Sequence, residues 1–340
     1  MTKIFVPQLI PEFALEKLEQ LGDVTVYEGT DGPMPHDEVV AAVRDKDILF
    51  AMAEIDFDEE VIDAAENLRM VAAMHMRATF VDQKACTRRG VPVSGLPNFV
   101  SKTAAEFTFA MLVATAWRLP EADQFLRAGK WTQNQSTAFV GTRLYGKTLG
   151  IVGMGTVGSH VAKRAAACEM DIIYHKRNRL SPAEEFALGG ASYRSLEDLF
   201  MESDFVLLST ALTAETKGLV GEGLISLMKP SAILINTSRG PILDEVALEK
   251  ALREGRIRGA GLDVYLTEVP EPNPGPIPGL LDLPNVVLTP HMGSAARETR
   301  EEMAMRTVNN IERFLQGKRP FDVLNPEVYG DTARHEEAIG

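Results

Sequence analysis

The chain has few cysteines and no long apolar run. Cysteine occurs twice in 340 residues, as Cys86 and Cys168. Two cysteines so far apart in sequence predict neither a disulfide framework nor a metal site, and their scarcity is typical of a reducing compartment. No stretch of about 18 apolar residues is present, and acidic residues soon follow Met1, unlike the start of a signal peptide. We therefore expect a cytoplasmic protein that neither crosses nor binds a membrane.

Positive charge is also scarce. The sequence has 35 Lys and Arg residues against 48 Asp and Glu residues, which gives a formal net charge of −13. Proteins that hold nucleic acid or an anionic membrane usually carry a basic excess. Neither is therefore an expected partner, and any anionic ligand must be held by a local group of cations.

Short apolar runs alternate with amphipathic segments, a pattern typical of parallel α/β folds. At roughly 100–200 residues per domain, this length suggests two domains. In the first part, the pattern predicts strands at residues 3–6, 24–28, 48–52 and 69–74, a strand followed by a loop within 90–98, and helices at 11–22, 37–45 and 58–68. A second series starts at Lys147, and its six strand candidates are typical of a doubly wound dinucleotide-binding sheet. They cover residues 148–155, 171–175, 205–210, 232–237, 259–264 and 285–290.

Four further segments have a distinct character. Residues 103–117 read as a helix that is apolar on most faces, so it is buried in its own domain or, as we slightly prefer, in a subunit interface. Another helix is expected at about 298–316. The proline-rich segment 268–284 should be an irregular loop. Residues 331–340 have little apolar content and are expected to form a mobile tail.

The sharpest motif is G-M-G-T-V-G, from Gly153 through Gly155, Thr156 and Val157 to Gly158. It follows a predicted strand and opens a predicted helix, which is the context that a dinucleotide fingerprint requires. Its glycines would allow a tight turn, a close approach of amides to a pyrophosphate, and close packing of helix on strand. A structural turn without a ligand is the alternative.

The next predicted strand ends without an acid. Dinucleotide sites specific for NAD usually place Asp or Glu there to hold the ribose 2′-hydroxyl. This chain instead continues through His175, Lys176, Arg177 and Arg179. Lys and Arg can pair with a 2′-phosphate, so we predict NADP(H) rather than NAD(H), with a solvated basic loop as the alternative.

Three further motifs make a family resemblance specific. They are INTSRGPILDEVAL (235–248), GAGLDVYLTE (259–268) and LTPHMGSA (288–295). With GMGTVG, they make the chain, over about residues 1–326, resemble the D-isomer-specific 2-hydroxyacid dehydrogenase family and, within it, the glyoxylate/hydroxypyruvate reductases.

The resemblance implies an architecture of two doubly wound α/β domains. A Rossmann cofactor domain (101–292) would be inserted in a flavodoxin-like substrate domain (1–100 with 293–330). The active site would lie in the cleft, with hinges near Asn98 and Gly293. The family also implies a homodimer.

The same resemblance implies Arg239, Glu268 and His291 as catalytic residues. An arginine can hold a carboxylate in a bidentate fork. A histidine can give a proton to the keto oxygen near neutral pH. A neighbouring glutamate would favour the imidazolium and orient the ring. The remaining predicted cofactor residues stand at strand ends or next to the catalytic histidine: Thr210, Thr237, Asp263 and Gly293.

One stretch departs from the family. Residues 73–82 read AMHMRATFVD, whereas the family usually has a glycine-rich turn whose amides receive the substrate carboxylate. We predict that His75, Met76 and Arg77 face the substrate. An inward Arg77 would favour a substrate with a second acid or phosphoryl group, and inward Met74 and Met76 would form an adaptable apolar wall. Alternatively, the side chains point away and the amides act as usual.

The expected activity is therefore NADPH-dependent, reversible reduction of a small anionic 2-keto acid, such as glyoxylate or hydroxypyruvate, to the D-2-hydroxy acid. A phosphite- or phosphonate-type oxyanion dehydrogenase is a second possibility on this scaffold. A third is a non-catalytic, corepressor-like module that senses the dinucleotide, because fold alone does not prove function.

Overall fold

The computed structural model describes residues 1–29, 32–134, 136–268 and 273–330. The chain forms two compact units. The first combines Met1–Phe99 with the segment that starts at Ala295, and the second is Val100–Ser294. The predicted tail at 331–340 lies outside the described residues.

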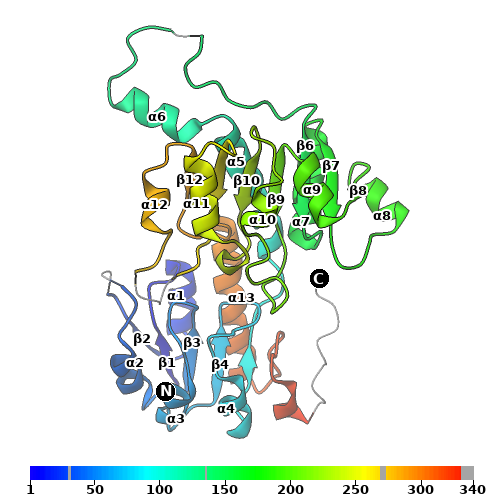
Figure 1. Ribbon diagram of the computed structural model, residues 1–340. Coiled ribbons are helices and arrows are strands. Elements are labelled where there is room, and N and C mark those ends of the chain that lie inside the picture. Colours follow the sequence, from blue (N-terminus) through cyan, green and yellow to red (C-terminus); the bar gives the residue numbers. More distant parts are fainter. Residues whose placement is uncertain (30–31, 135, 269–272, 331–340) are drawn as a thin grey trace. The chain divides into compact units, whose positions relative to one another are not determined.

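The first unit is built on a five-stranded parallel sheet with the order β2-β1-β3-β4-β5 (Figure 1). This is the flavodoxin-like order, in which the chain builds outwards from β1 in both directions. Every residue of β3 and β4 is buried, as expected for strands covered on both faces. The strands are β1 (Lys3–Val6), β2 (Asp23–Val26), β3 (Ile48–Ala51), β4 (Met70–Ala73) and β5 (Val93–Ser94).

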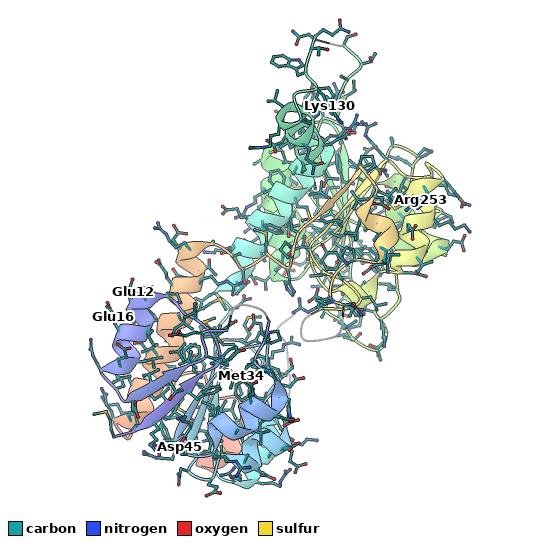
Figure 2. The ribbon with its side chains drawn as sticks, turned by 90° about the vertical axis from the view of Figure 1, so that its left-hand side faces the viewer. Glu12, Glu16, Met34, Asp45, Lys130 and Arg253 are labelled. Carbon is teal, nitrogen blue, oxygen red and sulfur yellow. The ribbon has the colours of Figure 1, made fainter. Side chains whose placement is uncertain are left out.

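Amphipathic helices cover this sheet. α1 (Glu12–Glu19) buries Ala14 and Leu18 and exposes Glu12 and Glu16, which Figure 2 shows on its outer side. Asp58 and Asp82 cap two short helices by accepting hydrogen bonds from backbone amides, which stabilises their first turns. The other helices of this unit are α2 (His36–Val43), α3 (Glu59–Ala64), α4 (Gln83–Arg88), α13 (Arg297–Leu315) and the 3₁₀ turn η2 (Pro326–Tyr329).

The second unit is built on a seven-stranded parallel sheet with the order β12-β11-β10-β9-β6-β7-β8. Counted from β6, the first six strands have the order 3-2-1-4-5-6 of dinucleotide-binding sheets. All six predicted strands are present, and the predicted α/β class with two doubly wound sheets is confirmed. The strands are β6 (Thr148–Val152), β7 (Asp171–His175), β8 (Ser192–Tyr193), β9 (Phe205–Leu208), β10 (Ile233–Asn236), β11 (Gly259–Leu262) and β12 (Val286–Leu288).

The long apolar helix is α5 (Val100–Ala116), and it packs against α7 (Thr156–Ala167) and against β10, β11 and β12 of its own unit. Its buried residues include Ala105, Met111 and Leu112, so the domain core accounts for much of its apolar surface. The predicted role of α5 in a subunit interface stays a prediction. The other helices of this unit are α6 (Leu119–Arg127), α7 (Thr156–Ala167), α8 (Pro182–Ala187), α9 (Leu196–Glu202), α10 (Glu222–Ile225), η1 (Gly240–Ile242), α11 (Glu245–Arg253) and α12 (Pro278–Leu281).

The proline-rich segment is more ordered than the sequence predicts. The prediction of an irregular loop over 268–284 is wrong for 278–281, which form α12 with Pro278 at its first position, where proline suits a helix. Thr267 and Gly275 also pair as an antiparallel bridge. Residues 269–272 lie outside the described part of the chain.

Candidate functional site

Residues far apart in sequence meet at the carboxyl edge of the seven-stranded sheet. Gly153 follows β6, Thr210 follows β9, Thr237 follows β10, Asp263 follows β11 and His291 follows β12. The sheet is parallel throughout, so all five lie along the edge where doubly wound sheets bind ligands. The Thr237 hydroxyl is tied to α5, because it lies 2.6 Å from the hydroxyl of Thr108.

The turn after β6 has space only for glycine at two positions. Gly153 has a φ of 98°, and a Cβ there would lie 2.6 Å from the carbonyl oxygen of Ser209 and 2.7 Å from Thr210 Cα. A Cβ on Gly158 would lie 2.4 Å from the Gly153 oxygen. α7 begins directly after Gly155, and no described side chain caps it. Its first amides, which include those of Thr156 and Val157, therefore suit a phosphate group.

The basic tip after β7 is partly paired within itself. Arg179 donates to Glu185 over 3.0 and 3.2 Å, and Glu185 also accepts a 2.8 Å hydrogen bond from Tyr174. His175 Nδ1 lies 3.0 Å from the carbonyl oxygen of Arg194. Two of the four side chains predicted as cofactor ligands at this tip, Arg179 and His175, thus have partners in their own unit.

Arg177 differs from Arg179. Both side chains are exposed, but the charge of Arg177 only contributes to the lowered pKa of Glu215, where a hydrogen bond from Thr213 is the larger cause. Lys176 similarly contributes to the lowered pKa of Glu184, where the hydrogen bonds from Ser181 are the larger cause. Lys176 and Arg177 therefore interact more weakly with neighbouring acids than Arg179 does with Glu185.

Glu268 and His291 form a close pair. Glu268 Oε2 lies 2.8 Å from His291 Nδ1, and Glu268 Oε1 accepts a hydrogen bond from the Tyr265 amide. The hydrogen bond to Glu268 raises the pKa of His291 against the opposing effect of burial. Burial alone would raise the pKa of Glu268, but the His291 bond and charge, with smaller contributions from Tyr265 and Arg239, lower it overall. The pair therefore favours an imidazolium beside a carboxylate.

Asp263 holds the loop that carries His291. Its carboxylate, which is only 1% exposed, accepts hydrogen bonds from the Thr289 hydroxyl (2.6 Å), the Met292 amide (2.7 Å) and the Gly293 amide (3.0 Å). Its backbone oxygen accepts from the His291 amide. These bonds hold His291 at a φ of 53°, a conformation that non-glycine residues rarely adopt. The predicted cofactor contacts of Asp263 and Gly293 stay predictions.

Tyr265 is a positioning residue that the sequence analysis missed. It is buried, and its hydroxyl donates to the Thr289 carbonyl (2.7 Å) and accepts from the Thr289 amide (3.1 Å). Its own amide holds Glu268. Tyr265 thus joins the segment of the glutamate to the segment of the histidine. The sequence shows a tyrosine two residues beyond Asp263. It does not show that the partner of this tyrosine is Thr289, which lies 24 residues further along the chain.

Glu245 was also missed. Its carboxylate is 4% exposed, and its two oxygens accept from the amides of Leu266 (2.7 Å) and Ile277 (3.1 Å). These residues flank the paired Thr267 and Gly275 at the base of the loop that carries Glu268. Asp244 already caps α11, which leaves Glu245 for the loop. Of these two adjacent acids, Asp244 therefore caps the helix and Glu245 holds the loop that carries Glu268.

Arg239 lies in extended backbone before η1, and its side chain is exposed. Buried Asn236 fixes this segment by donating to the Arg239 carbonyl and accepting from the Ser238 amide. A Cβ on Gly240 would lie 1.7 Å from the Tyr265 oxygen, so η1 packs backbone against backbone beside the glutamate segment. The charge of Arg239 makes a small contribution to the lowered pKa of Glu268, and it acts weakly against the hydrogen bond to Glu268 that keeps the pKa of His291 raised. The second unit thus brings the three predicted catalytic side chains within electrostatic reach of one another.

In the first unit, the unusual turn follows β4. His75 Nδ1 accepts hydrogen bonds from the amides of Arg77 (3.2 Å) and Ala78 (3.1 Å). These two amides therefore already have an acceptor in the protein. In the family pattern, by contrast, the amides of this turn receive the substrate carboxylate. Met74 is buried in the unit, whereas Met76 and Arg77 are exposed.

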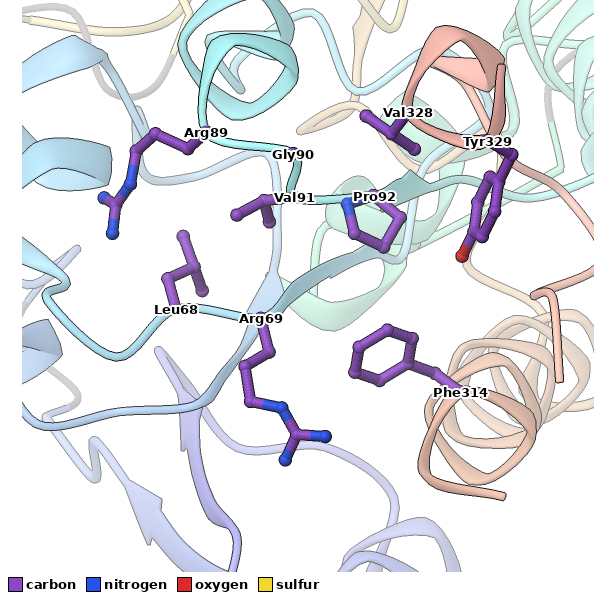
Figure 3. A pocket seen from close by; sticks show the side chains of 9 residues that line it. All are labelled: Leu68, Arg69, Arg89, Gly90, Val91, Pro92, Phe314, Val328 and Tyr329. Carbon is purple, nitrogen blue, oxygen red and sulfur yellow. The ribbon is translucent and has the colours of Figure 1, made fainter. Parts of the chain in front are cut away.

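A cavity of about 350 Å³ lies at the opposite edge of the five-stranded sheet (Figure 3). Leu68 and Arg69 precede β4, and Val91 and Pro92 precede β5, so the cavity is at the amino ends of these strands. Ligands of doubly wound sheets bind at the carboxyl ends. The cavity is therefore separate from the turn at His75. Its lining is Leu68, Arg69, Arg89, Gly90, Val91, Pro92, Phe314, Val328 and Tyr329.

The described part of the chain contains no helix that is both long and apolar enough to pass through a bilayer.

Known proteins are similar to this chain in both sequence and fold. Residues 109–293 match the family model "D-isomer specific 2-hydroxyacid dehydrogenase, NAD binding domain". The chain is 41% identical to a glyoxylate reductase of Pyrococcus furiosus and 42% identical to one of Aeropyrum pernix, each over 96% of both chains. It is also similar to the crystal structure of an NADPH-dependent glyoxylate/hydroxypyruvate reductase from Sinorhizobium meliloti in complex with NADP and malonate. That similarity has a TM-score of 0.78 at 29% identity and covers 96% of this chain and 98% of the other.

Proposed function

The chain belongs to the D-isomer-specific 2-hydroxyacid dehydrogenases, and on this premise we propose that it uses NADPH to reduce a small 2-keto acid, of the kind of glyoxylate or hydroxypyruvate, to the D-2-hydroxy acid. The observation that carries the proposal is the 2.8 Å contact between Glu268 and His291 at the carboxyl edge of a dinucleotide-binding sheet. Two relatives that match nearly the full chain are named glyoxylate reductase, and they support this substrate class.

Two of the catalytic side chains act directly on the keto acid, while Glu268 keeps His291 protonated and oriented. Arg239 binds the carboxylate of the keto acid through its guanidinium. His291 gives a proton to the keto oxygen and, in the reverse direction, accepts it from the hydroxyl. Since His291 Nδ1 faces Glu268, the proton moves through Nε2. The reduced nicotinamide, when bound, supplies the hydride that completes the reduction at the keto carbon.

We assign the dinucleotide to the second unit and substrate recognition to the first. The glycine turn at 153–158 has the close approaches that a pyrophosphate site needs, and α7 offers uncapped amides beside it. Thr210 and Thr237 stand at neighbouring strand ends and would line the cofactor. In the first unit, His75, Met76 and Arg77 would contact the substrate, as the family resemblance implies for this turn.

The preference for NADPH rests on the tip of β7. Residues 176–179, directly after His175, include no acid, and exposed Arg177 with Lys176 can pair with a 2′-phosphate. The related reductase from Sinorhizobium meliloti is NADPH-dependent. Steady-state kinetics with each cofactor should give a higher kcat/KM for NADPH. Equal efficiency with NADH would contradict the preference.

The reaction itself is tested by following NADPH oxidation with a panel of 2-keto acids and NADP reduction with the D-hydroxy acids. Replacing His291→Ala should lower kcat by at least about 10²-fold. The matched control is His36→Ala, which removes an exposed histidine of the first unit. Tight NADPH binding without turnover would instead favour a binding module. Turnover of phosphite alone would favour an oxyanion dehydrogenase.

We further propose a homodimer in the cytoplasm. Figure 1 shows α6 and the segment after it reaching away from the seven-stranded sheet, and Figure 2 labels Lys130 near the end of α6. This part of the second unit exposes several large apolar side chains, which commonly mark a protein interface. Light scattering should give twice the mass of the 37.2 kDa chain. The exposed side chains are Trp117, Leu119, Leu126, Trp131 and Val140.

A further inference from the structure

The turn after β4 has its own anion-binding amides occupied. Two successive amides that converge on one point form a concave site for an anion. Here the amides of Arg77 and Ala78 converge on His75 Nδ1 at 3.2 and 3.1 Å. Because this nitrogen accepts two hydrogen bonds, the neutral ring carries its proton on Nε2. A substrate carboxylate could take these amides only by displacing the imidazole.

The backbone that carries Arg77 is held from several directions. Gln83 Nε2 donates to the carbonyl oxygens of Arg77 (2.8 Å) and Ala78 (3.2 Å). The His75 ring packs edge-on against Phe80, with the ring centroids 5.5 Å apart. Ala78 is fully buried with a φ of 45°. The base of the Arg77 side chain is therefore fixed rather than part of a loose loop.

The guanidinium of Arg77, by contrast, is available. The side chain is exposed, and no other side chain in the described ranges forms an ion pair or hydrogen bond with it. Many other arginines of this acidic chain are paired, as Arg179 is with Glu185. An exposed cation on a fixed turn is suited to binding an anion from solution.

Its place in the fold agrees with this. The turn follows β4 at the carboxyl edge of a sheet with the order β2-β1-β3-β4-β5, where flavodoxin-like sheets bind their ligands. At the same edge, Glu54 after β3 accepts a hydrogen bond from Gln8 after β1. Glu54 thus already has a partner.

We propose that Arg77 binds a second anionic group of the substrate, so that the preferred substrates are 2-keto acids with an additional carboxylate or phosphoryl group. The inference rests on the proposed function, in which Arg239 takes the carboxylate beside the reacting carbonyl. Because His75 occupies the backbone amides of this turn, the guanidinium of Arg77 binds the anion in their place.

Matched substrate pairs test it. The first pair is 2-ketoglutarate and 2-ketovalerate, which have equal chain length but differ by one carboxylate. The second is phosphohydroxypyruvate and hydroxypyruvate, which differ by a phosphoryl group. In at least one pair, the wild-type enzyme should show a kcat/KM about 10-fold or more higher for the substrate with two anionic groups, whatever their total charge. Below, this substrate is called the dianion and its partner with one anionic group the monoanion. The pair that shows the preference identifies the anionic group.

Replacing Arg77→Gln should lower kcat/KM for the preferred dianion by about 10- to 100-fold, mainly through KM, because a hydrogen-bonded charge is lost. The loss with the monoanion of that pair should be several-fold smaller, and Arg77→Lys should restore part of the preference. Arg44→Gln, an exposed arginine after α2, is the control. An equal loss with both substrates of the pair would overturn the inference.

A second variant tests the part played by His75. His75→Phe keeps a ring beside Phe80 but removes the acceptor, so the amides of Arg77 and Ala78 become available to a single carboxylate. The ratio of dianion to monoanion efficiency should fall in a variant whose melting temperature shows that it is folded. An unchanged ratio would contradict the role of His75. Turnover of monoanions with no dependence on Arg77 contradicts the inference alone, whereas no turnover of any 2-keto acid contradicts the proposed function as well.

Discussion

Glu268 Oε2 lies 2.8 Å from His291 Nδ1, and the same glutamate is held by the Tyr265 amide through its other oxygen. The contact raises the pKa of His291 above its ordinary 6.5. Reduction needs the protonated ring. Its rate should therefore persist at neutral pH and fall as the pH rises through the raised pKa. Oxidation needs the neutral ring, so its rate should rise over the same interval.

Replacing Glu268→Gln should move the alkaline fall in reduction to lower pH, because the largest cause of the raised His291 pKa is weakened. We also expect kcat at neutral pH to fall by at least about 10-fold, since less of the proton donor is present and its ring is less well oriented. The measurement is kcat/KM for the keto acid between about pH 5.5 and 9.5, across the ordinary histidine pKa. The control, Glu222→Gln, removes an exposed partner of Lys250. An alkaline limb that stays in place would contradict the assigned role of Glu268.

Glu245 should matter for activity although it lies outside the motif's catalytic residues. Replacing Glu245→Ala removes the acceptor of two amides at the base of the Glu268 loop. We expect a loss of about 1–3 kcal/mol in unfolding free energy, with a lower kcat and an altered pH profile as the pair with His291 loosens. Glu245→Gln should recover part of both. Val246→Ala, at an exposed neighbouring position, should change stability by no more than about 0.5 kcal/mol. A stability loss with an unchanged pH profile would make Glu245 merely structural.

The sequence predicts most of the sheet architecture, because buried parallel strands are short apolar runs between amphipathic helices. It misses β8, whose two residues are too few to form such a run. It also misses α12, because the local proline content outweighed the favourable place of Pro278 at the first helical position. Propensity is local, and these elements depend on neighbours that only the folded chain supplies.

The same limit applies to the site. The motifs identify Arg239, Glu268 and His291, but they do not show that Tyr265 and Glu245 hold the segments around them. Those contacts join residues 21 to 32 positions apart. Nor could a count of cations at the tip of β7 show that Arg179 has Glu185 as its partner. Residue type suggests chemistry, while the pairing of charges depends on the fold.

Packing at the phosphate turn makes Gly158 a sensitive position. In Gly158→Ala, the new Cβ would lie 2.4 Å from the Gly153 oxygen, so the turn must shift. Overpacking of this kind costs about 1–3 kcal/mol, which corresponds to roughly a 5- to 150-fold weaker Kd for NADPH where the shifted turn must bind the cofactor. Titration of the intrinsic fluorescence would measure it. Gly223→Ala, which meets nothing within 4 Å, is the control and should bind NADPH as the wild type does. Equal affinity for both variants would remove the turn from the cofactor site.

The pairing of Arg179 also separates the cations at the tip of β7. Arg177 is exposed, whereas Arg179 is engaged by Glu185, which Tyr174 holds in turn. Arg177→Gln should therefore lower kcat/KM for NADPH by roughly 10-fold or more, as expected for the loss of a hydrogen-bonded charge. Arg179→Gln should cost less, because that guanidinium must first leave a carboxylate. Neither variant should lower kcat/KM for NADH, which has no 2′-phosphate. If Arg179→Gln costs as much as Arg177→Gln with NADPH alone, the ion pair with Glu185 opens when the cofactor binds, and the ranking argued from the free enzyme is wrong.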